Sequence, residues 1–180
     1  FSGELGYEIY CHPSYLIRLT EAIEVAGSES GYVWYGARAM MSMRLEKGWG
    51  AWGLEYRPDF NVMESGLDKF VNWDKEFIGK EASLRARKKP LKIKLVSMTI
   101  DVEGIDVYND EAILHEGTAV GYVTSGGYGH RTKKSMAMGY VKSDFANPET
   151  QLQVEILGRF YDATVLSSSL YVTYGATMRV

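Results

Sequence analysis

The feature that most constrains the fold is a series of short, alternating apolar runs between residue 91 and residue 165. Apolar side chains recur at every second position in two of the clearest runs, residues 136–140 and 152–156. This period is typical of strands with one buried face, and strands this short and frequent favour a small antiparallel barrel. Leu157-Gly158-Arg159 separates two of the runs and is predicted to form a hairpin turn.

The first of these strands changes phase in its middle. Its apolar residues occupy odd positions from Leu91 to Leu95 and even positions from Val96 to Ile100. One extra residue in a strand moves every later side chain to the opposite face. We therefore predict a β-bulge within one long strand over residues 91–100.

The first half of the chain is patterned mainly for helices. Residues 7–10 have strand character, and Pro13 to Gly27 carries the start, apolar stripe and stop of a helix. A second, amphipathic helix is predicted from residue 37 to Gly48, with Arg38, Arg44, Glu46 and Lys47 at its polar positions. A short helix from residue 77 ends in the basic, proline-terminated segment 85–90.

That basic segment is the predicted domain boundary, since strand patterning begins directly after it. We expect an α+β protein with an incomplete αβ domain over residues 1–88 and an antiparallel β-barrel over residues 89–180.

The composition indicates a globular protein and argues against nucleic acid or membrane as a binding partner. The 180 residues are 46% hydrophobic and 24% charged, as in a globular protein, and the net charge of -3 gives no general attraction to nucleic acid or anionic membrane. The basic cluster of residues 80–94 is favoured as a solvated linker. No apolar run is long enough to span a membrane. We expect neither nucleic acid nor membrane as a partner.

The lone Cys11 cannot form an internal disulfide, which favours a reducing compartment, either the cytoplasm or a mitochondrial matrix. The chain opens on Phe1 without an initiator methionine or leader, so we expect it to be a piece of a longer polypeptide.

Common catalytic signatures are absent from the sequence. Adjacent Cys11 and His12 would point to opposite faces of a strand, and the three histidines lack metal-ligand spacing, so no metal site is predicted. The glycine-rich residues 124–130 fail the P-loop pattern, and a structural turn is favoured over a ligand-facing one. Trp49 and Trp52 follow Gly48 closely, and packing is favoured over the sheltering of a planar ligand.

Glu8 is the most informative polar residue. It shares one face of the predicted strand with Tyr10. Its carboxylate suits either a structural ion pair with Arg38 or a ligand that offers two adjacent N–H donors. The residues alone leave both possibilities open.

Several motifs together resemble the glycine-cleavage aminomethyltransferase family. They are SGELGYEIY at residues 2–10, GAR and MRLE within residues 36–46, ESGL at 64–67, GYVTSG at 121–126 and KSMAMGYV at 134–141. Within this superfamily, residues 44–53, 77–82 and 125–128 are most similar to the C-terminal halves of dimethylglycine and sarcosine dehydrogenases.

The resemblance implies a folate-binding part of a flavin-dependent N-methyl amine dehydrogenase, which passes a one-carbon unit to tetrahydrofolate. FAD would belong to a preceding N-terminal domain of the same polypeptide. The family's pterin-binding glutamate falls on Glu8, with Ile9 and Tyr10 beside it, and its ligand-contacting arginine falls on Arg38. The family's catalytic aspartate would precede Phe1, so no catalytic residue is expected in this chain and the isolated chain is expected to be inactive.

Two departures from the dehydrogenase pattern keep alternatives open. Phe1 and Lys69 stand where tyrosines are expected. A non-catalytic folate-binding scaffold module therefore remains an alternative to the dehydrogenase. A stand-alone aminomethyltransferase of glycine cleavage is a second enzyme alternative.

Overall fold

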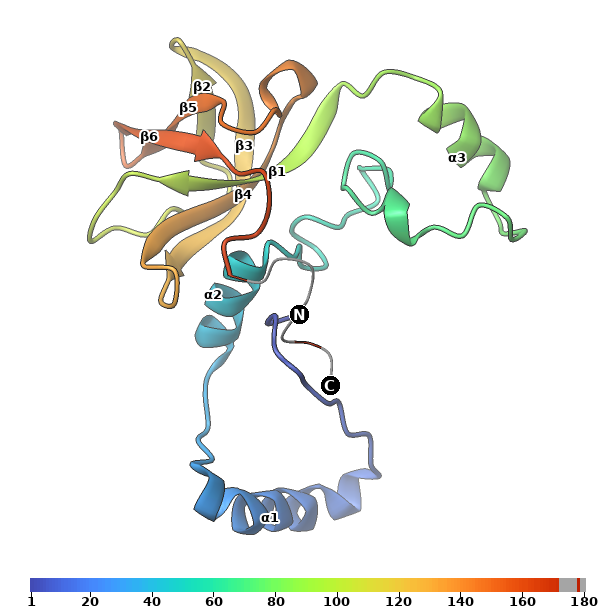
Figure 1. Cartoon of the computed structure of the whole chain (residues 1–180), viewed down its shortest axis with the longest axis vertical. Helices are drawn as coiled ribbons and strands as arrows, with labels where there is room; N and C mark the ends of the chain where they lie inside the picture. The colour runs from blue at the N-terminus through green and yellow to red at the C-terminus, as the bar shows by residue number, and fades with distance from the viewer. Residues whose placement is uncertain (172–177, 179–180) are drawn as a thin grey trace.

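The computed structural model describes residues 1–171 and residue 178, which form a helical part and a β-barrel (Figure 1). The helical part contains α1 (Leu16–Gly27), α2 (Ala37–Lys47) and α3 (Lys80–Arg87), with 3-10 helices at Pro13–Tyr15, Ser28–Ser30 and Asp68–Phe70. The barrel contains β1 (Ile93–Ile100), β2 (Ala112–His115), β3 (Thr118–Gly129), β4 (Lys134–Lys142), β5 (Gln151–Ile156) and β6 (Arg159–Val165), with a 3-10 helix at Ser143–Phe145. The predicted α+β class is confirmed. The boundary at residues 88 and 89 stays a prediction.

The six strands close into an antiparallel barrel in the order β1-β4-β3-β2-β5-β6, with β6 pairing back onto β1. The predicted hairpin between β5 and β6 is confirmed. Its two loop residues, Leu157 and Gly158, have φ angles of 50° and 76°. Two left-handed residues match the right-handed twist of the flanking strands.

Even-numbered residues of β1 fill the barrel, but the predicted bulge in this strand is wrong. Val96, Met98 and Ile100 belong to the core, and β1 pairs with β4 without a shift from Ile93 to Ile100. Leu95 lies on the outer face, where it lines a hollow beside α2. The change of phase therefore reflects a strand with apolar contacts on both faces. A register shift occurs in β3 instead, between Val123 and Ser125.

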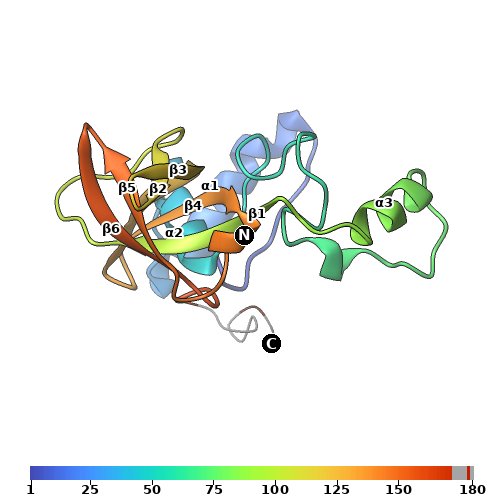
Figure 2. The same ribbon diagram turned by 90° about the horizontal axis from the view of Figure 1, so that it is seen from above.

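Strand β4 is buried on both faces and joins the two parts of the molecule. Ala137 and Val141 lie in the barrel core, whereas the ring of Tyr140 stacks on Phe60 at 3.6 Å between centroids. Phe60 belongs to the loop that follows α2. In Figures 1 and 2, α2 lies against the barrel, and it contacts β3 and β4.

The predicted turn at residues 124–130 is wrong, because β3 continues to Gly129. A Cβ atom at Gly126 would lie 2.0 Å from Cγ1 of Val107. The glycine here therefore permits close packing inside a strand and does not form a loop.

The predicted helices are confirmed, although the one expected from residue 77 begins at Lys80. The strand predicted over residues 7–10 is wrong, because these residues have no regular secondary structure and no partner strand in the described part of the chain. Helix α1 projects from the body of the molecule in Figure 1, and α3 does so in Figures 1 and 2. Neither helix contains a buried residue. None of the described helices has the length and apolar character needed to cross a bilayer.

Candidate functional site

The predicted ligand-binding residues of the N-terminal segment are exposed. Ile9 is 61% and Tyr10 is 87% accessible to solvent. The Tyr10 hydroxyl donates a hydrogen bond of 2.5 Å to Oε2 of Glu8, so these two side chains do lie together. This hydrogen bond, and then the negative charge of Glu8, raise the pKa of the Tyr10 phenol.

Arg38 lies in the first turn of α2 and is also exposed. Among the residues that the structure describes, it forms no salt bridge, and the polar partner of Glu8 is Tyr10. The structural ion pair between Glu8 and Arg38 is therefore not formed. The ligand-binding alternative for Glu8 is left as a prediction.

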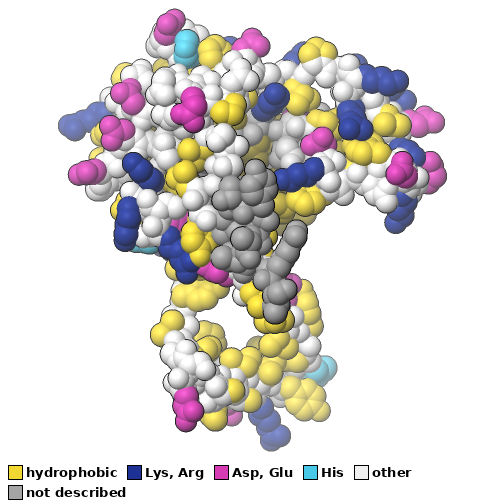
Figure 3. All heavy atoms as spheres, viewed as in Figure 1, with side chains coloured by type: hydrophobic (Ala, Val, Ile, Leu, Met, Phe, Trp, Pro, Cys, Tyr) yellow, Lys and Arg dark blue, Asp and Glu magenta, His cyan; other side chains and the backbone are white. Residues whose placement is uncertain are grey.

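Apolar side chains surround this region without being buried. Figure 3 shows an open gap between the N-terminal segment and the segment that connects α1 to α2, with hydrophobic atoms around it. Exposed residues of these segments and α1 include Leu5, Tyr7, Tyr15, Leu16, Ile17, Val25, Val33, Trp34 and Tyr35. The segment that carries Glu8 thus belongs to an extensive apolar surface.

A buried ion pair joins α2 to the loop that follows it, through Arg44, which lies at a position predicted to be polar. Arg44 Nη1 lies 3.1 Å from Oε2 of Glu55, and both side chains are fully buried. Burial lowers the pKa of Arg44, and the charge of Glu55 opposes this effect. Glu55 also accepts hydrogen bonds from the hydroxyls of Thr124 and Ser125 at 2.6 and 2.5 Å, and from the Ala51 N–H at 2.7 Å.

Glu46 is a buried carboxylate of α2, again at a position predicted to be polar. It is 1% accessible, and its Oε1 accepts the backbone N–H groups of Arg131 and Thr132 at 2.8 Å each. A carboxylate that receives two backbone donors fixes the turn between β3 and β4 against the helix.

Tyr140 of β4 adds further polar contacts to the loop that carries Glu55. Its hydroxyl lies 2.8 Å from the Ser65 hydroxyl and donates a 2.9 Å hydrogen bond to the Glu55 carbonyl. Burial raises the pKa of Tyr140 to about 12, although the Ser65 hydrogen bond opposes the shift. No local pattern marks Glu55, because its side-chain partners Arg44, Thr124 and Ser125 lie 11 to 70 positions away.

A hollow of about 790 Å³ lies beside the C-terminal end of α2, and its walls include Trp49, Tyr56, Phe70, Lys47 and Lys69. Trp49 meets both other rings edge to face, at 5.9 and 5.6 Å between centroids. Trp52 is 87% exposed and meets Tyr56 in the same manner. The two tryptophans thus pack edge to face against neighbouring aromatic rings, and no parallel stacking of either ring is found among the described residues.

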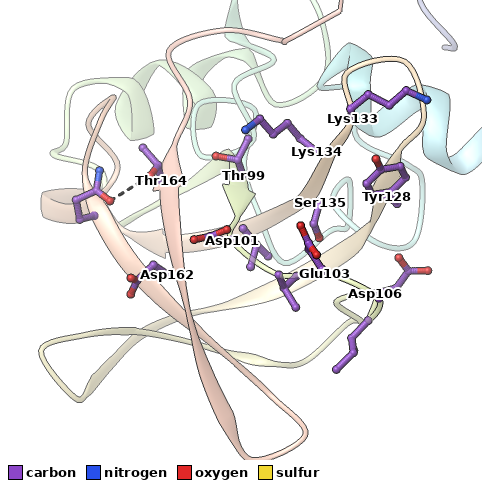
Figure 4. A pocket seen from close by; sticks show the side chains of 15 residues that line it. Thr99, Asp101, Glu103, Asp106, Tyr128, Lys133, Lys134, Ser135, Asp162 and Thr164 are labelled. Carbon is purple, nitrogen blue, oxygen red and sulfur yellow. Dashed lines mark hydrogen bonds between the residues drawn. The ribbon is translucent and has the colours of Figure 1, made fainter.

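A second hollow, of about 940 Å³, lies at the rim of the barrel near the end of β1 (Figure 4). Acidic residues including Asp101, Glu103 and Asp162 line it together with Lys133 and Lys134. No predicted ligand-binding residue reaches it. The residues that the structure describes contain no group of three or more acidic, cysteine or histidine side chains suited to a metal ion.

Cys11 and His12 do not form a catalytic pair. Cys11 is exposed, whereas Nδ1 of His12 accepts a 3.3 Å hydrogen bond from the Ser14 backbone N–H at the start of the first 3-10 helix. His12 therefore has a capping role.

Curated relatives include both dehydrogenases and aminomethyltransferases. The mitochondrial dimethylglycine dehydrogenase of Homo sapiens is 39% identical over 175 residues, covering 96% of this chain and 20% of that protein. The aminomethyltransferase of Halothermothrix orenii is 34% identical over 160 residues, covering 88% of this chain and 44% of that protein. The chain thus spans less than half of each of these two relatives.

A crystal structure of glycine cleavage system aminomethyltransferase T from Bartonella henselae has the same fold. It matches with a TM-score of 0.74 at 24% identity, over 91% of this chain and 45% of that chain. Family models match in the same order: residues 1–75 match the GCVT N-terminal domain, and residues 94–171 match the glycine cleavage T-protein C-terminal barrel domain. The chain therefore belongs to the glycine cleavage T-protein family.

Proposed function

We propose that this chain binds tetrahydrofolate and is the one-carbon-transfer part of a flavin-dependent N-methyl amine dehydrogenase of the dimethylglycine or sarcosine type. The observation that carries the proposal is the state of Glu8. One of its carboxylate oxygens accepts from Tyr10, while the other has no hydrogen-bond partner among the described residues. The carboxylate is exposed within an apolar surface, so it retains acceptor capacity for a ligand.

The chemistry of the ligand fits this arrangement. The pterin ring of tetrahydrofolate presents an exocyclic amine beside a ring N–H, and a carboxylate accepts such a pair of donors in a bidentate manner. Ile9 and Tyr10 would contribute apolar and aromatic contact beside it. Arg38 is free of salt bridges to the described residues, and its guanidinium would attract the acidic tail of folate.

We assign ligand binding, and no catalytic residue, to this chain. The exposed apolar surface around Glu8 would be covered by a preceding part of the same polypeptide, and that part would bring the FAD domain and the family's aspartate. The relatives named above are more than twice as long as the matched region, which supports this view. Location in the cytoplasm or the mitochondrial matrix stays a prediction.

A stand-alone aminomethyltransferase is the second candidate, because such enzymes match 88% of the chain at 34% identity. The polypeptide that precedes Phe1 distinguishes the two, since the dehydrogenase requires a flavin-binding glycine-rich fingerprint far upstream. A folate-binding scaffold without catalysis is a third candidate, motivated by Phe1 and Lys69 at positions where tyrosines are expected. Lys69 lines the hollow beside α2. Turnover of an N-methyl amine by the polypeptide that carries this chain would exclude the scaffold.

Ligand-observed NMR titration with tetrahydrofolate tests the proposal and detects the weak binding expected of the isolated chain. We expect Glu8→Gln to weaken binding about tenfold or more, because one strong charged acceptor is lost. Glu21→Gln on exposed α1 removes the same charge elsewhere and serves as the matched control. Equal affinity of the wild type and Glu8→Gln would exclude Glu8 as the pterin acceptor.

A further inference from the structure

Glu4 connects the N-terminal segment to the barrel. Its Oε1 accepts a hydrogen bond from the Tyr171 hydroxyl and forms an ion pair of 2.5 Å with Nη1 of Arg131. The Arg131 guanidinium also lies over the Tyr171 ring, 4.5 Å from its centroid. We call these three residues the Glu4 clasp.

The barrel side of the Glu4 clasp is held by buried contacts. The Arg131 N–H donates to the Glu46 side chain at 2.8 Å, and the Tyr171 N–H donates to the Glu46 carbonyl at 3.2 Å. Glu46 itself is almost completely buried. Both partners of Glu4 are thus hydrogen-bonded through their backbones to Glu46 of α2. We call this attachment the anchor of the N-terminal segment.

Glu4 is also where the chain leaves the body of the molecule. Gly3 is buried and has a φ angle of 85°, whereas residues 5–12 are all exposed. In this part of the described structure, the polar contacts of residues 5–11 are limited to the one between Tyr10 and Glu8. Glu8 follows Glu4 by four positions, so it lies within about 14 Å of the anchor.

We propose that Glu4 and Arg131 are positioning residues for Glu8, so that the β3–β4 turn of the barrel controls the folate site of the helical part. The effect on folate rests on the function proposed above, whereas the restraint of the segment does not. An exposed ion pair contributes little to global stability. Its loss should therefore change the mobility of the segment and the affinity for folate without unfolding the barrel.

The chain's single cysteine supplies a reporter for the restraint. Cys11 is exposed and lies in the segment, so a nitroxide label on it reports segment mobility by electron paramagnetic resonance. We expect Glu4→Gln and Arg131→Gln to raise the mobility of the label to a similar extent. The double variant should add little, because both changes break one interaction. Arg131→Lys, which keeps the charge, should restore part of the restraint.

Glu21→Gln is the matched control and should leave the spectrum and the melting temperature unchanged. Equal label mobility in the wild type and Glu4→Gln would show that the Glu4 clasp does not restrain the N-terminal segment. Purely additive effects in the double variant would lead to the same conclusion. A large fall in melting temperature in both single variants would assign it a structural role instead.

Titration of the unlabelled proteins with tetrahydrofolate separates this inference from the proposed function. We expect the dissociation constant to rise about threefold to tenfold in Glu4→Gln and Arg131→Gln. Higher label mobility with unchanged affinity would overturn the positioning role. If the wild type does not bind tetrahydrofolate, the proposed function fails, and the positioning role fails with it, although the label still decides the restraint.

Discussion

Three glutamates of the helical part show how the environment decides the role of one residue type. Glu46 and Glu55 are buried, and each accepts several hydrogen bonds from the barrel or the loop after α2. Such carboxylates are structural, because they are buried and their hydrogen bonds hold other segments in place. Glu8 is exposed and has a single donor, Tyr10, among the described residues. Of these three, Glu8 is the carboxylate that a ligand can reach from solvent.

The pair of Glu8 and Tyr10 gives a test at the level of single residues. The hydrogen bond to Glu8, and its charge, raise the pKa of Tyr10 because both disfavour the phenolate. Glu8→Gln should lower the Tyr10 pKa, as measured by NMR titration of ¹³C-labelled tyrosine. The exposed variant Glu21→Gln should leave that titration unchanged. A Tyr10 pKa that is the same in Glu8→Gln would show that the contact is absent in solution.

Tyr140 gives a second test. Its phenol is buried, whereas that of Tyr10 is exposed. Burial raises its pKa to about 12, above the unfolded value of about 10. The stabilisation by the neutral phenol is thus complete below pH 10 and is lost as the pH rises towards 12. The free energy of unfolding should fall by about 1–2 kcal/mol over this range. Urea titrations should show a smaller fall for Tyr140→Phe; an equal fall would assign the loss to other groups.

At the level of elements, α2 contacts β3 and β4, and charged side chains are prominent among its buried residues. Arg44, Leu45 and Glu46 are its buried residues and are consecutive in sequence. Arg44 remains incompletely paired, since its Nε and Nη2 atoms have no partner within the described structure. The polar contacts of Arg44 are therefore made by Nη1, which forms the ion pair with Oε2 of Glu55 and reaches the Trp49 carbonyl and the sulfur of Met138.

Removing one partner of this pair should be costly. Arg44→Met leaves the Glu55 carboxylate buried without its cation, and we expect the free energy of unfolding to fall by about 3–5 kcal/mol in urea denaturation. The double change Arg44→Met with Glu55→Leu removes both charges and should cost less than Arg44→Met alone. A single variant that loses less than about 1 kcal/mol would contradict a structural role for the pair.

The sequence predicted those features that depend on neighbouring residues. The barrel, the β5–β6 hairpin and the end of α2 at Gly48 follow from local periodicity and turn chemistry, and the structure has all three. The errors concern contacts between distant segments. The burial of Arg44 could not be predicted locally, because Thr124 and Ser125, which bind its partner Glu55, lie 80 and 81 positions further along the chain. Whether residues 7–10 pair with another strand also depends on distant residues, so their own pattern could not show that a partner strand is missing.

At the scale of the whole molecule, the buried side chains are distributed unevenly between the barrel and the helical part. The main hydrophobic core lies in the barrel and the strand connections, whereas α1 and α3 bury no residue. The predicted site residues Glu8, Ile9, Tyr10 and Arg38 all lie in the exposed part. A ligand or a preceding polypeptide segment that binds there should stabilise the helical part, because it binds the folded state preferentially.

The central claim is that Glu8 accepts the paired N–H donors of the pterin. A thermodynamic cycle tests it most directly, with the affinities of the wild type and Glu8→Gln for tetrahydrofolate and for its analogue without the 2-amino group. The claim predicts that the wild type loses about tenfold to a hundredfold affinity for the analogue, whereas Glu8→Gln hardly distinguishes the two ligands. Equal discrimination by both proteins would contradict the claim.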